Sequence, residues 1–218
     1  EISECLVGSE MCIRDSMKGV VQGEKNILFV NMAWGLGLGI IIDGNLYYGK
    51  SGFSGEFGHF CMFENEVLCH CGKKGCLETE ASGSAFHRIL IERYREGSNT
   101  ILAGKLDSGE EISLGDLLEA VRKEDVLCID ILEKMGVNLG KGIAGLMNIF
   151  NPELVVLGGP LSQTGEYLSL PIKSAVRKYS LNLVTRDTQI KVSKLGERAG
   201  ILLSLIHISE PTRHSLIS

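Results

Sequence analysis

The chain has 218 residues, a formal net charge of -5, 44% hydrophobic residues and 22% charged residues. This composition is typical of a globular protein and excludes a disordered or fibrous one. Because no sustained basic stretch stands out among the 22 basic and 27 acidic residues, direct nucleic-acid binding by this segment is not expected. No apolar run reaches the roughly 18 residues of a membrane span, and no leader peptide is recognised. We therefore expect a cytoplasmic protein without membrane contact.

The two ends of the sequence fit poorly with what lies between them. Residues 1–16 carry no helical or strand period, and residues 202–218 differ in character from the stretch before them. Both ends resemble translated adapter or read-end sequence, and an unusual pair of genuine tails is the alternative. We expect one domain over residues 17–201, flanked by artefact segments at 1–16 and 202–218.

The first expected elements are strands. Two apolar runs, Ile27–Ala33 and Leu38–Ile42, have strand character. A turn at residues 43–45 leads into Leu46–Tyr48, which predicts a β-hairpin. Residues 49–58 are rich in glycine and are expected to form a loop.

Helices are expected next. Apolar residues recur with a helical period over residues 79–95, and Ser113 followed by Asp116 is typical of an N-cap for a helix at Leu114–Arg122. A longer helix should run over residues 124–149 and end at Asn151-Pro152. It contains several glycines, each of which costs about 1 kcal/mol in a helix interior. They predict either close packing against another backbone or a break in this helix.

The last elements alternate between strand and helix. Leu154–Leu157 reads as a buried strand, a glycine turn follows, and a helix is expected at Leu168–Tyr179. Gln189–Leu195 alternates between apolar and polar residues and predicts another strand. Strands that alternate with helices favour an α/β fold.

Cysteine usage points to a metal. The chain has seven cysteines, and an odd number in a chain without a leader argues against a disulfide framework. His59, Cys69, Cys71 and Cys76 form the pattern H-x9-C-x-C-x4-C, in which three thiolates and one imidazole complete a tetrahedral zinc shell. With four protein ligands no coordination position stays open, so the zinc is expected to be structural rather than catalytic.

Two alternatives to this ligand set exist. His70 is a rival nitrogen ligand, although its place between two cysteines would more easily point it away from the ion. The other alternative is that the cysteines are merely buried thiols and the histidine is unrelated. Cys61 and Cys128 are expected to be small buried hydrophobic residues outside the site.

Three motifs together closely resemble the ROK family, which comprises bacterial sugar kinases and sugar-responsive transcriptional repressors. They are GFSGEFGH at residues 52–59, CHCGKKGCLE at residues 69–78 and NPELVVLGG at residues 151–159. The resemblance covers about residues 17–201. It implies an actin-like, ribonuclease-H-like ATPase fold of two lobes, of which this chain would be mainly the C-terminal lobe.

The resemblance also implies a sugar site. Glu56 resembles the family's acceptor for sugar hydroxyls, His59 resembles a zinc ligand that also faces the sugar, and Glu78 resembles a second sugar-binding carboxylate. A carboxylate can accept hydrogen bonds from two neighbouring hydroxyls, and such charge-assisted bonds are strong. The zinc would hold the loop so that both glutamates converge. The alternative is that both are solvated surface residues.

The resemblance leaves open whether the protein is a kinase or a repressor. The kinases carry a second phosphate loop of the type Gly-Thr-Gly-x-Gly, and here residues 34–39 read WGLGLG. Gly35 and Gly37 could still bring backbone amides to an anion. Leu36 stands where the kinases have threonine and cannot offer a hydroxyl to a nucleotide, and Trp34 adds bulk before the loop. We expect a repressor, with no catalytic residue in this segment and with DNA contact only through a helix-turn-helix domain ahead of it.

Two other functions remain as alternatives. An ATP-dependent kinase for a hexose or N-acetylhexosamine would use Gly158 and Gly159, which resemble a nucleotide-side glycine turn but also suit a plain strand-to-helix connection. ATP is expected as a cofactor only in that case. A zinc-stabilised interaction module is the third function. The resemblance further implies a homodimer or homotetramer.

Overall fold

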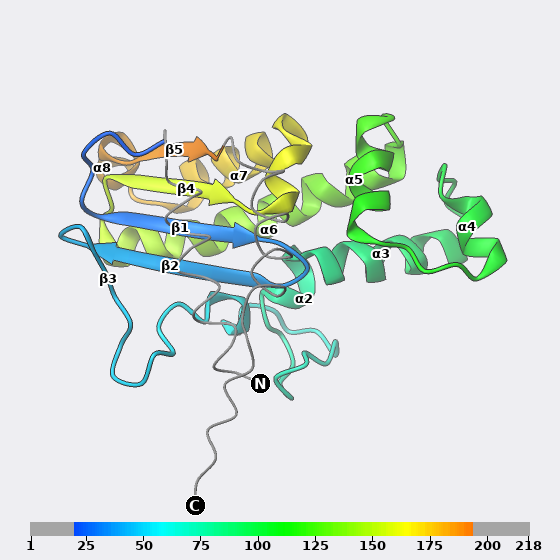
Figure 1. Cartoon of the computed structure of the whole chain (residues 1–218), viewed down its shortest axis with the longest axis horizontal. Helices are drawn as coiled ribbons and strands as arrows, with labels where there is room; N and C mark the ends of the chain where they lie inside the picture. Colours follow the sequence, from blue (N-terminus) through cyan, green and yellow to red (C-terminus); the bar gives the residue numbers. More distant parts are fainter. Residues whose placement is uncertain (1–19, 194–218) are drawn as a thin grey trace, which may run out of the picture.

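The computed structural model describes residues 20–193, so the expected artefact segments and the expected domain end at residue 201 lie outside it. The described part forms a mixed sheet with two long helices on one face (Figure 1). Beyond one end of the strands, shorter helices form an arm (Figure 1). The strands are β1 (Ile27–Met32), β2 (Leu36–Ile42), β3 (Asn45–Leu46), β4 (Leu154–Gly158) and β5 (Gln189–Val192). The helices are η1 (Phe57–His59), α2 (Glu78–Ala81), α3 (Gly83–Arg95), α4 (Ala103–Ser108), α5 (Leu114–Arg122), α6 (Val126–Phe150), η2 (Pro160–Thr164), α7 (Glu166–Tyr179) and α8 (Asn182–Asp187).

The sheet combines an antiparallel meander, β1–β2–β3, with two parallel strand pairs, β1–β4 and β4–β5. Its strand order is β3-β2-β1-β4-β5, with β1 and β2 antiparallel and both β1–β4 and β4–β5 parallel. Parallel neighbours need crossover connections, and helices such as α6 and α7 provide them. The α/β architecture expected from the alternation of strands and helices is therefore confirmed.

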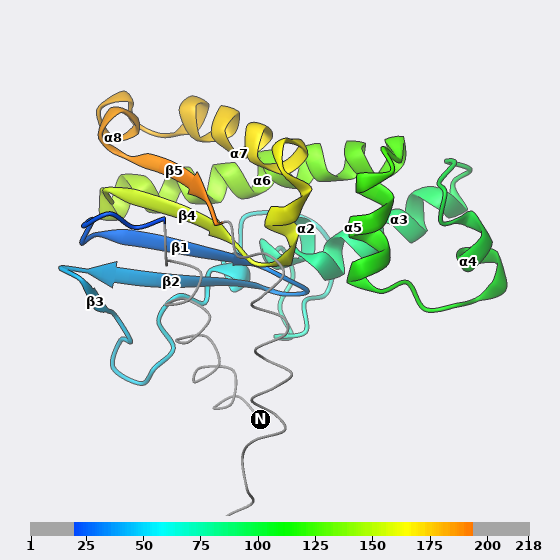
Figure 2. The same cartoon turned by 45° about the horizontal axis from the view of Figure 1, so that its top comes forward.

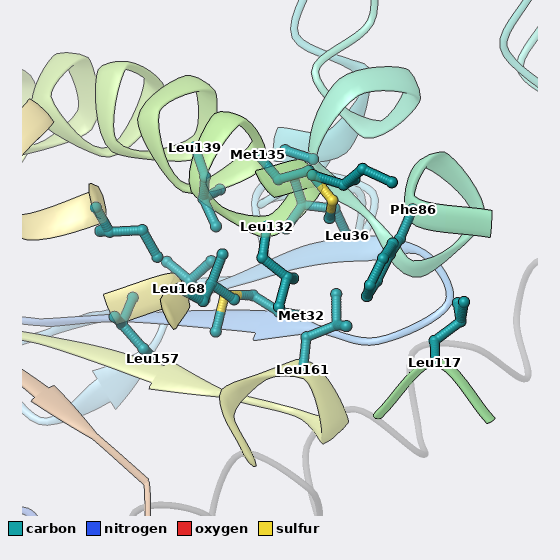
Figure 3. Close-up of a cluster of buried hydrophobic side chains, with 14 of the residues drawn as sticks. Met32, Leu36, Phe86, Leu117, Leu132, Met135, Leu139, Leu157, Leu161 and Leu168 are labelled. Carbon is teal, nitrogen blue, oxygen red and sulfur yellow. The ribbon is translucent and has the colours of Figure 1, made fainter. Parts of the chain in front are cut away.

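The main core lies between the sheet and α6 with α7. Alternate residues of β1 point to opposite faces, and the face with Leu28, Val30 and Met32 belongs to this core. Figure 3 shows Leu132 and Leu139 of α6 directed at the same cluster as Met32. Figure 2 shows α6 and α7 running side by side along that face. Packing against these helices fixes the position of β1, and the chain continues from β1 into the turn at residues 33–35.

Helix α6 is not broken, and three of its four glycines lie at close contacts, whereas a Cβ at Gly145 would meet nothing within 4 Å. A Cβ at Gly140 would lie 2.6 Å from the Ile172 carbonyl oxygen of α7, and one at Gly136 would lie 2.8 Å from Pro171 Cβ. A Cβ at Gly142 would lie 2.8 Å from the ring of Phe57. The cost of glycine in the helix is therefore offset by contact with α7 and with the loop that precedes the metal ligands.

Several expected boundaries need correction. Residues 79–95 do not form one helix, because Ser82 is extended (φ -126°, ψ 174°) and separates α2 from α3 while its side chain caps Ala85 N–H. The strand expected from Leu38 begins at Leu36. Helices α4 and α8 were not expected from the sequence. The capping box at Ser113 and Asp116 is confirmed.

Within residues 20–193, no helix combines the length and the apolar character that a membrane crossing requires.

Candidate metal and sugar site

The four expected metal ligands come together. One ligand atom each of His59, Cys69, Cys71 and Cys76 lies within 4.8 Å of all the others. The sulfurs of Cys71 and Cys76 are 3.7 Å apart, and Cys69 Sγ is 3.5 Å from His59 Nδ1. Two sulfurs bound at about 2.3 Å to a tetrahedral ion would be about 3.8 Å apart. The spacing and the donor set therefore fit zinc.

The knuckle, residues 59–77, is shaped by tight turns rather than by regular structure. Cys69 N–H donates to Lys73 O (2.8 Å), and Gly72 N–H donates back to Cys69 O (2.9 Å). Gly72 and Gly75 both have a positive φ, of 84° and 77°. A Cβ at Gly75 would lie only 2.1 Å from Phe63 O, whereas one at Gly72 would meet nothing within 4 Å. Only Gly75 is therefore required for close approach as well as for its backbone conformation.

The thiols differ in how readily they lose a proton. Burial raises the pKa of Cys76 to about 12, and burial also raises the pKa of Cys69. The backbone amide of Lys73 lowers the pKa of Cys71, which lies at the exposed edge. Zinc binds thiolates, so an ion must displace the protons of the two buried thiols.

The expectations for the remaining cysteines are met only in part, and His70 contacts a carboxylate. Cys128 is buried as predicted, but the prediction for Cys61 is wrong because its side chain is exposed. His70 lies near Cys69 Sγ (3.9 Å), yet its Nδ1 is 2.9 Å from Glu78 Oε1. His70 is therefore paired with a carboxylate and lies outside the set of three cysteines and His59.

The Glu78 side chain accepts a hydrogen bond from the backbone where the turn between β1 and β2 meets β2. The amide of Leu36 donates to Glu78 Oε2 at 2.9 Å, across 42 residues of sequence. A Cβ at Gly35 would lie 3.0 Å from the same oxygen, and one at Gly58 would lie 3.1 Å from it. The side chain is only 9% exposed. Two glycines thus let backbone enclose one carboxylate oxygen, and the other oxygen faces His70.

His59 brings a ring nitrogen within 4.8 Å of this carboxylate, and Glu56 lies next to His59. His59 Nε2 is 3.8 Å from Glu56 Oε2, and the Glu56 side chain is 54% exposed. Between them, Phe57 fills the notch left by Gly142 of α6, while Gly58 packs against Leu36 O and Glu78. The GEFGH segment therefore joins the metal ligand, the exposed carboxylate and the buried carboxylate through one short 3-10 turn.

The turn at residues 33–35 corrects the expectation for Leu36. The side chain of Leu36 belongs to the hydrophobic core, so no side chain at this position would face a nucleotide. The exposed residue of the turn is Trp34, which is 48% exposed and has its ring 5.6 Å from that of His87. A Gly-Thr-Gly-x-Gly pattern fits this geometry when Trp34, rather than Leu36, takes the place of threonine.

The glycines expected near a nucleotide have structural reasons of their own. A Cβ at Gly158 would lie 2.5 Å from the ring of Phe29. A Cβ at Gly159, whose φ is 83°, would lie 2.5 Å from Met32 O. Gly35 approaches Glu78, whereas a Cβ at Gly37 would meet nothing within 4 Å. Of the four, only Gly37 lacks a packing reason.

Two contacts of the Glu78 carboxylate, with the Leu36 amide and with His70, were not predicted from the sequence. The Leu36 amide carries no sequence signal, because any residue but proline offers the same group. From the sequence, His70 is expected only as a rival metal ligand, although its place next to Cys69 also brings it near Glu78. Both contacts join segments that are distant in the sequence, so spacing alone could not assign them.

A family model described as the ROK family matches residues 15–206. Among curated relatives, a glucokinase of Halalkalibacterium halodurans is 35% identical over 186 residues, which cover 85% of this chain and 56% of the relative. A xylose repressor of Caldicellulosiruptor bescii is 32% identical over 182 residues, which cover 82% of this chain and 44% of the relative. The chain thus spans about half the length of these relatives.

Solved structures give the same division. A ROK family transcriptional regulator, described as a homologue of the Escherichia coli MLC protein, is similar with a TM-score of 0.77 at 33% identity. The similarity covers 86% of this chain and 47% of the regulator. A ROK family glucokinase of Streptomyces griseus, in complex with glucose and AMPPNP, gives a TM-score of 0.71 at 31% identity over 83% of this chain and 59% of the enzyme.

Proposed function

Because this chain belongs to the ROK family, we propose that it is the sugar-sensing lobe of a transcriptional regulator, which binds a hexose-type inducer beside a structural zinc ion. In this proposal residues 17–201 form the C-terminal lobe. DNA contact belongs to a helix-turn-helix domain outside this segment, and the protein works as a homodimer or homotetramer.

The sugar site in this proposal consists of Glu56, His59 and Glu78. Two carboxylates and an imidazole can together accept and donate hydrogen bonds to several neighbouring hydroxyls of one sugar ring. Zinc bound through His59 Nδ1 would leave the Nε2–H of the same ring free to donate. The ion would supply structural support, because its four protein ligands leave no open position for chemistry.

The observation that carries the regulator reading is Trp34. It occupies the exposed tip of the turn between β1 and β2, which is the place where the kinase pattern has threonine. The amides of Gly83 and Ser84, at the start of α3, donate to Ala33 O and Trp34 O at 2.8 Å and 2.9 Å. An indole therefore replaces the hydroxyl that would contact a nucleotide, and two helix amides near it are already bonded.

Sequence similarity supports the second candidate, an ATP-dependent sugar kinase. The glucokinase of Halalkalibacterium halodurans is 35% identical, slightly above the xylose repressor at 32%. The structural order is reversed, because the regulator has the higher TM-score, 0.77 against 0.71. These margins are small, and they report on the shared fold more than on phosphate chemistry. We therefore give greater weight to Trp34.

Trp34 also supplies the test, because it is the chain's single tryptophan. We expect glucose, N-acetylglucosamine or xylose to change its fluorescence in the zinc-loaded chain, since the turn that bears it is bonded to Glu78. Titration with Mg-AMPPNP should leave the fluorescence unchanged. Glu78→Gln should abolish the sugar response while zinc content stays constant, and Glu64→Gln, on the exposed loop, is the matched control.

The results separate the candidates. Saturable binding of Mg-AMPPNP to the unaltered chain, lost in a Gly35→Val variant, would favour the kinase. Absence of any sugar response at tens of millimolar, confirmed by calorimetry, would contradict the sugar-binding proposal for this chain.

A further inference from the structure

A line of polar side chains runs from the exposed Glu56, through two histidines, to the buried Glu78. Glu56 Oε2 lies 3.8 Å from His59 Nε2, and the rings of His59 and His70 meet edge to face at 4.9 Å between centroids. His70 Nδ1 then lies 2.9 Å from Glu78 Oε1. The two carboxylates assigned to the sugar are thus linked through two imidazoles, of which only His59 belongs to the predicted zinc set.

The Glu78 carboxylate needs a donor at Oε1. Its Oε2 already accepts the Leu36 amide, but Oε1 lies 3.9 Å from Cys69 Sγ. When zinc is bound, this sulfur is a thiolate, so a carboxylate oxygen faces an electron-rich ligand atom in a nearly buried place. An N–H group on the same oxygen offsets this contact, and His70 Nδ1 is at the distance of such a bond.

We propose that His70 is a positioning residue of the sugar site. Its Nδ1–H donates to Glu78 Oε1 and, together with the Leu36 amide on Oε2, fixes the plane of the carboxylate that accepts the sugar hydroxyls. A carboxylate oxygen has two lone pairs, so Oε1 can accept the His70 bond and a hydroxyl at once. The inference rests on the proposed function, because it assigns a role within the sugar site.

His70 could instead join a metal, since His59, His70 and Glu78 also bring ligand atoms within 4.8 Å of one another. His59 Nδ1 faces Cys69 Sγ, however, and the imidazole of His70 is already paired with Glu78. Its side chain is 73% exposed, and its ring meets that of His59 edge to face. The geometry therefore favours a hydrogen bond to Glu78 over metal ligation.

The first test reads the hydrogen bond directly. In the zinc-loaded full chain, long-range proton–nitrogen NMR spectra should show His70 as the Nδ1-protonated tautomer. The Nδ1 signal should shift in Glu78→Gln and stay unchanged in Glu64→Gln. An Nε2-protonated tautomer, or an Nδ1 signal indifferent to Glu78→Gln, would overturn the proposal whatever the sugar result.

The second test compares three substitutions by sugar affinity. His70→Ala should raise the Kd for the sugar that the unaltered chain binds by about tenfold, the loss of one charge-assisted hydrogen bond. His70→Asn should restore most of the affinity, because its amide reaches the Nδ1 position, whereas His70→Gln, which reaches the Nε2 position, should not. Zinc content should be the same in all three, and Lys73→Ala is the control within the knuckle.

The outcomes distinguish this inference from the function on which it rests. An unchanged or lower Kd in His70→Ala overturns the positioning role and leaves the sugar site standing. Loss of zinc in His70→Ala would make the residue a ligand and also overturn it. If the unaltered chain binds no sugar, the proposed function fails, and the positioning role fails with it.

Discussion

The knuckle and helix α6 show two different ways of fixing a backbone. The knuckle contributes Leu77 to the main core, but Phe60 and Leu68 are 58% and 68% exposed and its backbone is shaped by turns. Four side chains that could hold a metal ion come together within it. Along α6, Leu132, Ile143 and Met147 have no exposed area at all. The comparison indicates that apolar packing fixes α6, whereas we expect the shape of the knuckle to depend also on a bound ion.

Metal loss should produce the largest effect. Cys71→Ser removes a ligand, so we expect zinc to fall from about one ion per chain to nearly none, with loss of up to about 10 kcal/mol of binding free energy. Trypsin should then cut at Lys73 and Lys74, while the helical circular dichroism persists because α6 is held by packing. Metal analysis and limited proteolysis measure both. Cys61→Ser is the control, and loss of zinc there would show that the ligand set is wrong.

A cavity in the core should lower the free energy of unfolding and leave the zinc content unchanged. Ile143→Ala removes a fully buried side chain of α6 and should lower the free energy of unfolding by about 2–5 kcal/mol, measured by urea denaturation. Zinc content should not change. Ile149→Ala, on the same helix but at a side chain 72% exposed, should cost little. Zinc loss in Ile143→Ala would contradict the separation of the two regions.

Two glycines sharpen the comparison inside the knuckle. Gly75→Ala should weaken zinc binding by about 2–5 kcal/mol, because its Cβ would press on Phe63 O in addition to the strain of a positive φ. Gly72→Ala carries the same backbone strain without the contact and should cost about 1–2 kcal/mol. Competition with a chromogenic chelator measures both affinities. Equal losses would show that the close approach to Phe63 is unimportant.

The pH dependence of zinc affinity tests the same region without a substitution. Burial raises the pKa of Cys76 to about 12 in the metal-free chain, so its thiol is protonated at neutral pH and zinc must displace that proton. As the pH falls from about 8 to 6, apparent affinity should drop about tenfold per unit for each displaced proton. Chelator competition at several pH values checks this, and a flat profile would contradict it. The helical signal of α6 should not change over this range.

Much of the fold follows from local pattern. The apolar runs predict β1 and β4, the Ser113–Asp116 spacing predicts α5, and Asn151-Pro152 marks the end of α6. Each of these signals lies within a few residues, where propensity, capping and turn chemistry act. The break at Ser82 was missed, because the apolar period continues through it and only contacts of Glu78 and the β1–β2 turn require two helices.

The sequence by itself predicted the family and the cluster of His59, Cys69, Cys71 and Cys76, since cysteine spacing and the family motifs are local and specific. It could not determine which residue of the β1–β2 turn faces outward, nor what His70 contacts. Leu36 and Trp34 are both apolar, and only the register of β1 against β2 buries one and exposes the other. Likewise, Glu78 meets Leu36 across 42 residues. Such contacts arise from the folding of distant segments onto one core, so the tertiary structure alone decided them.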